Sequence, residues 1–105
     1  MNKYILVNGK PKRCDNLTEW GRFMETGERI VGKTTLGGGV TVSTVFLGID
    51  HNFLWTGAPV LWETMIFGGE FNGYQERYTS KEDAEKGHKI AFGIAMGSCE
   101  APKGS

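Results

Sequence analysis

Apolar and polar positions alternate in several short segments of this chain, and glycine-rich turns separate the segments. A period of two is typical of strands, so we predict strands over residues 3–7, 28–36, 40–49, 60–67 and 74–78. A brief return strand at 11–13 follows the turn signal at Asn8 and Gly9. The run at 40–49 is the longest, and its pattern predicts an interior strand covered fully on one side and partly on the other. The polar 74–78 run predicts a half-exposed edge strand.

A helical period appears first after residue 16. Asn16 is a good cap for free backbone amides, and Glu19 occupies the reciprocal capping position three residues later. Leu17, Trp20 and Met24 then fall on one face of a helix. We therefore predict a first helix that ends near residue 27.

A second helix is predicted over residues 81–96. Ser80 and Asp83 fit a capping box at its start. Small residues dominate one face, which predicts that the helix packs closely on a sheet. The centre of that face is formed by Ala84, His88, Ala91 and Ala95.

The order of these segments is β-α-β-β-β-β-α, with short turns between consecutive strands. Short turns favour antiparallel neighbours, so we predict an α+β fold. Its core would be an antiparallel four- to five-stranded meander sheet with two helices packed on one face. Residues 1–97 would form a single domain, and residues 98–105 a flexible C-terminal tail.

Composition narrows the classes of partner. The 105 residues include twelve Lys and Arg and twelve Asp and Glu, so there is no overall basic excess for nucleic-acid binding. Apolar runs stay far below the roughly 20 residues that cross a bilayer, and no signal-peptide layout is present. Cys14 and Cys99 form no CxxC pair. We expect a cytoplasmic protein with free thiols, no cofactor and no membrane or nucleic-acid partner.

Residues that could act in catalysis follow the longest predicted strand. Asp50, His51 and Asn52 read most simply as a turn, because Asp and Asn bond their own backbone. The sharper interpretation makes His51 a general base oriented by Asp50, with Glu63 as a second carboxylate. Glu63 interrupts an apolar run, so on a buried face it needs a partner, whereas on a half-exposed strand it points to solvent. The candidate partners are His51, Arg77, His88 or an indole N–H.

A metal site is a weaker alternative. His51, Glu63 and His88 would supply two imidazoles and one carboxylate if the fold brought them together. No HExxH spacing supports this set, and His88 on an apolar stripe is more often a satisfied core histidine. We therefore predict no resident metal. A metal ion bound by these three side chains would contradict that prediction.

Aromatic residues suggest a binding surface instead. The segment 52–59 carries three large apolar side chains between Gly and Pro, and exposed aromatics on loops are typical anchors of interfaces. We predict a contact or oligomer surface there. A third possibility is an oligomeric nucleotide binder, in which Trp residues stack on a base and Arg77 meets a phosphate. The predicted binding residues are Asn52, Phe53, Leu54, Trp55 and Arg77.

The strings VSTVFLGIDHNF, WETMIFGG and ERYTSKEDAEKGH resemble a family of small proteins from tailed-phage and prophage genomes. The similarity covers roughly residues 3–95. It implies a phage-encoded protein in the bacterial cytoplasm, and it carries over no catalytic or binding residue. We expect a binding protein whose target is a host or phage protein, with a homo-oligomer as a further possibility. The rival is a small acid–base or metal-dependent enzyme using Asp50, His51 and Glu63.

Overall fold

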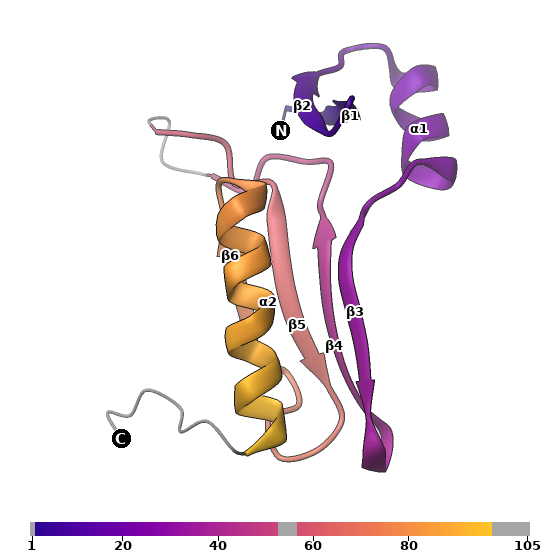
Figure 1. The fold of residues 1–105 in the computed structure, drawn as a ribbon. Helices are drawn as coiled ribbons and strands as arrows, with labels where there is room; N and C mark the ends of the chain where they lie inside the picture. Colours follow the sequence, from indigo (N-terminus) through magenta and orange to yellow (C-terminus); the bar gives the residue numbers. More distant parts are fainter. Residues whose placement is uncertain (1, 53–56, 98–105) are drawn as a thin grey trace.

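The computed structural model describes residues 2–52 and 57–97 of the chain (Figure 1). It contains a four-stranded antiparallel sheet in the order β3-β4-β5-β6, a separate β1–β2 hairpin and two α-helices. The α+β class and the antiparallel meander predicted from the sequence are confirmed. The elements are β1 (Tyr4–Val7), β2 (Lys10–Arg13), α1 (Leu17–Thr26), β3 (Ile30–Leu36), the short 3-10 turn η1 (Gly37–Gly39), β4 (Val40–Phe46), β5 (Trp62–Phe67), β6 (Gln75–Tyr78) and α2 (Lys81–Met96).

Helix α2 lies along one face of the sheet, and the hairpin and α1 lie at one end of it (Figure 1). The alternation in β4 buries Val42, Thr44 and Phe46 completely. In β5 the buried residues are Trp62, Thr64 and Ile66, so the even-numbered residues of both strands face α2. β4 is an interior strand with one fully covered face, as its alternation predicts.

Small residues let α2 approach the sheet closely. Ala84 and Ala91 are fully buried, and Gly87 is also buried. The helix spans the predicted residues, and the Ser80 hydroxyl accepts a hydrogen bond of 3.1 Å from the Asp83 amide. Local capping and the stripe of small residues together account for where this helix begins and how it packs.

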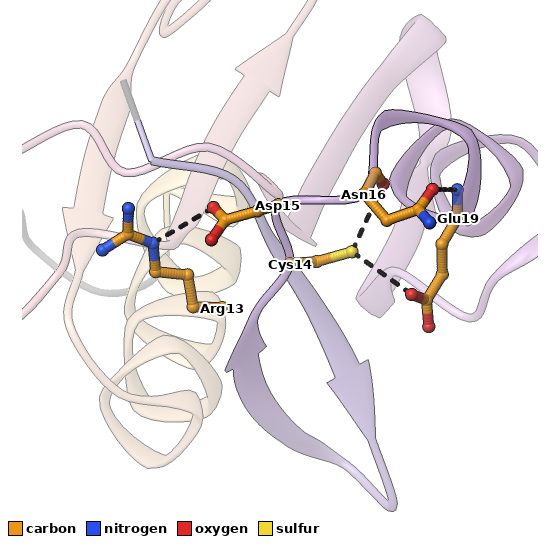
Figure 2. A network of polar contacts seen from close by, with 5 residues as sticks. All are labelled: Arg13, Cys14, Asp15, Asn16 and Glu19. Carbon is orange, nitrogen blue, oxygen red and sulfur yellow. Dashed lines mark hydrogen bonds and ion pairs between the residues drawn. The ribbon is translucent and has the colours of Figure 1, made fainter.

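Helix α1 begins at the predicted cap (Figure 2). The Asn16 side-chain oxygen accepts a 2.9 Å hydrogen bond from the Glu19 amide. The Glu19 carboxylate in turn accepts from the buried Cys14 thiol at 3.7 Å, a role that its capping position did not indicate. Leu17, which was predicted to share a helix face with Trp20 and Met24, is 64% exposed. Phe23 instead packs edge-on against Phe46, with 6.0 Å between ring centroids.

Candidate functional site

Asp50 closes the loop that joins β4 to β5. One carboxylate oxygen accepts hydrogen bonds from the amides of Asn52 (2.8 Å) and Val60 (2.9 Å). The His51 Nδ1 atom lies 2.8 Å from the Ile49 carbonyl oxygen. Because a carbonyl only accepts, Nδ1 donates the proton in this contact. These contacts agree with the turn interpretation, in which Asp50 shapes the backbone.

The aromatic part of that loop lies outside the described residues, so the prediction for Phe53, Leu54 and Trp55 stays a prediction. Asn52 is described, and its side-chain amide donates to the Ala58 carbonyl at 2.9 Å. The contact draws the two ends of the loop together.

Glu63 lies on the sheet face turned away from α2. Its carboxylate accepts from the Arg77 guanidinium at 2.9 Å and from the Gln75 amide. The Glu63 side chain is only 12% exposed and that of Arg77 is 40% exposed. Arg77 was one of the partners considered from the sequence, and the β5–β6 register places the two residues directly opposite. This ion pair occupies both the candidate catalytic carboxylate and the candidate phosphate-binding arginine.

The predicted metal ligands do not come together. Consecutive residues of a strand point to opposite faces, so Glu63 faces away from its neighbour Thr64. Thr64 lies on the α2 side, where His88 also lies. His88 and Glu63 are therefore separated by the sheet. Within residues 2–52 and 57–97, no group of three or more His, Cys, Asp or Glu side chains is placed to hold a metal ion.

A row of hydroxyl and imidazole groups crosses the sheet beneath α2. His88 Nε2 lies 3.1 Å from the Thr34 hydroxyl on β3, and Nδ1 lies 2.7 Å from the Thr44 hydroxyl on β4. Thr44 continues the row to Thr64 on β5 at 2.5 Å. Both threonines are fully buried, so these bonds satisfy groups that would be costly to leave unpaired.

Burial lowers the pKa of His88, because the interior disfavours the charged imidazolium. The imidazole is neutral at neutral pH, so one ring nitrogen donates to a threonine and the other accepts. The row is a structural network that ties α2 to three strands. The sequence analysis recognised His88 as a core histidine but missed Thr44 and Thr64. A threonine among apolar residues on the buried face of each strand is the signal that could have revealed them.

A groove of about 800 Å³ runs between β6 and α2. Its wall on the sheet side includes Phe71, Tyr74 and Tyr78, and its wall on the helix side includes Ile90 and Ile94. Burial raises the pKa of both tyrosines, so they stay neutral hydroxyls. Ile90 is 53% exposed, although it is a large apolar side chain. Charged side chains complete the lining: Glu76, Arg77, Asp83 and Lys86.

The α2 wall of the groove is a second row of residues at helical spacing. The sequence analysis used this spacing only for the row that faces the sheet. Asp83, Gly87, Ile90 and Ile94 succeed one another at helical spacing along the side of α2 beside β6. Ile90 lies outside the buried stripe, so only the position of β6 reveals that it borders a cavity.

Comparison with protein-family models, with curated proteins and with solved structures finds no match to this chain. The resemblance to small phage proteins therefore stays a prediction. No helix in the described part of the chain is long and apolar enough to span a membrane.

Proposed function

We propose that this chain is a small binding protein that attaches to another protein through the groove between β6 and α2. In line with the resemblance, it would be phage-encoded and would act on a host or phage protein in the bacterial cytoplasm. The single observation that carries the proposal is the apolar, aromatic-lined groove of about 800 Å³, with the exposed Ile90 at its border. Clefts of this size with a mostly apolar and aromatic lining are typical binding sites.

The lining favours a protein partner for a physical reason. Phe71, Tyr74 and Ile90 offer apolar surface whose burial stabilises a complex. Aromatic side chains of this kind are enriched among the residues that dominate binding energy. The groove opens along an edge strand, so a segment of another protein can lie along it without entering a closed cavity.

Acid–base catalysis has less support. The Asp50 carboxylate accepts two backbone amides, and Glu63 is held by Arg77 and Gln75. A general base must lie within hydrogen-bond reach of the proton that it takes. These groups instead hold the loop and the sheet, so we assign them structural roles.

The test is affinity capture from bacterial lysate with tagged protein, comparing two charge insertions on α2. Ile90→Lys places a cation on the groove, whereas Met96→Lys makes the same change at a residue of similar exposure, 52% against 53%, outside the groove lining. We expect a stoichiometric partner that is lost with Ile90→Lys, by at least about tenfold in affinity, and kept with Met96→Lys. Equal capture by both variants would refute the groove as the binding surface.

A further inference from the structure

The groove is bordered by the free edge of β6. Among residues 2–52 and 57–97, β6 pairs with β5 alone, so no described strand lies on its other side. The Tyr74 and Tyr78 carbonyls accept hydrogen bonds from Ile66 and Leu61, which shows that these residues turn their backbone groups toward β5. Backbone groups alternate along a strand, so Gln75 and Arg77 turn theirs outward. Two residues thus offer N–H and C=O groups to an added strand.

The side chains of β6 limit what can pair with that edge. Glu76 lies on the α2 side and lines the groove between Tyr74 and Tyr78. Its cross-strand neighbour on β5 is the uncharged Thr64. Arg77 also borders the groove, but its guanidinium is already paired with Glu63. From α2, Asp83 and Lys86 line the groove with opposite charges, so Glu76 is the charged side chain that β6 directs into the groove.

A second copy of β6 is a poor match for this edge. Symmetric antiparallel pairing centred on the strand sets Glu76 opposite Glu76 or Arg77 opposite Arg77. Like charges directly opposite one another destabilise a strand pair. Short, charged edges of this kind are a common defence against self-association. Charge complementarity therefore favours a different strand.

We propose that β6 accepts an extended segment of a partner protein as an added strand, with a Lys or Arg opposite Glu76 and apolar residues two positions to either side. This proposal rests on the proposed function and specifies its partner. Main-chain bonds to Gln75 and Arg77 would supply the pairing. The flanking apolar side chains would lie over Tyr74 and Tyr78, beside Ile90. The recognised pattern is apolar–x–basic–x–apolar.

The test uses two capped synthetic peptides, TITKTIT and TITETIT, titrated into the isotope-labelled full chain and followed by amide NMR spectra. We expect TITKTIT to bind about fivefold more tightly than TITETIT, because opposite charges replace like charges across one strand pair. The amide signals of Gln75 and Arg77 should shift with binding. Glu76→Lys should reverse the preference. Glu70→Lys, the same change at an exposed residue outside the groove, should leave it unaltered.

The amide spectrum of each variant also reports whether the variant is folded. Peptide binding that leaves Gln75 and Arg77 unshifted, or a preference that survives Glu76→Lys, would overturn strand addition. Absence of binding by both peptides would overturn it as well. The proposed function fails separately, when lysate capture does not depend on Ile90. If capture of a partner depends on Ile90 but the peptides show no preference, the groove binds a partner and strand addition to β6 is wrong.

Discussion

Replacing Gly87 by alanine reverses the usual effect of such a change in a helix. In a helix interior Ala is favoured over Gly by about 1 kcal/mol. Gly87, however, is buried against the Tyr78 ring. A Cβ atom built there would lie 2.5 Å from Tyr78 Cε1 and closer still to its Cζ and hydroxyl oxygen. Real Cβ contacts are not this short, so α2 or the tyrosine must move.

The magnitude follows from two opposing effects. Forcing an extra carbon into a packed interface costs about 1–3 kcal/mol, and the helix preference returns about 1 kcal/mol. We expect Gly87→Ala to lower the free energy of unfolding by about 1 kcal/mol. The same change at Gly21 in α1 should raise it by up to about 1 kcal/mol, because no atom of the described residues, apart from the flanking residues and the backbone of α1 itself, lies within 4 Å of the added carbon.

Urea denaturation followed by circular dichroism measures both variants. The decisive comparison repeats Gly87→Ala in a Tyr78→Ala background, where the obstructing ring is absent. There the change should stabilise by about 1 kcal/mol, so the sign of the effect depends on Tyr78. If Gly87→Ala stabilises the wild-type chain, or has the same effect in both backgrounds, the close approach of α2 to β6 is wrong.

Three further predictions concern the His88 row, the α1 cap and the ion pair. Burial lowers the pKa of His88 from its ordinary value of 6.5, so the unfolded chain binds this proton more readily. The contribution of His88 to stability is complete above pH 6.5 and is lost as the pH falls from 6.5 to the folded-state pKa. Urea titrations across this range should show the loss, and His88→Gln should reduce it; an unchanged slope would contradict the assignment. Asn16→Ala should cost about 1 kcal/mol by removing the cap, as thermal unfolding would reveal, and a cost near zero would argue against the cap bond. Glu63→Gln should cost about 0.5 kcal/mol at low salt and less at high salt, because Arg77 is partly exposed; a salt-independent cost would refute a charge effect.

Local signals in the sequence were sufficient for most of the elements. The alternation from Val40 onward and the capping residue Ser80 are properties of neighbouring positions, and both strand β4 and helix α2 follow from them. Strand ends were less accurate. The segment predicted from residue 28 begins at Ile30, next to a register irregularity in its pairing with β4. Such irregularities depend on the neighbouring strand, which local patterns do not contain.

The residues of the candidate site also differ in how far the sequence alone predicts their contacts. Four partners for Glu63 were consistent with the sequence, and the β5–β6 register selected Arg77 by setting it directly opposite. The turn interpretation of Asp50 could be drawn from residue type alone, because an Asp side chain bonds amides close to it in the chain. The groove could not be predicted from residue type, because its walls come from β6, from α2 and from the loop that carries Phe71.

The sequence by itself determined which segments are strands and helices, where the helices begin and that the class is α+β. Only the tertiary structure decided that His88 bonds Thr34 and Thr44, which lie 54 and 44 positions away in the chain. It also decided that Ile90 borders a groove while Ala91 is buried. The reason is physical: backbone propensity and capping act over a few residues, whereas a groove or a buried polar row exists only after distant segments have packed in one register.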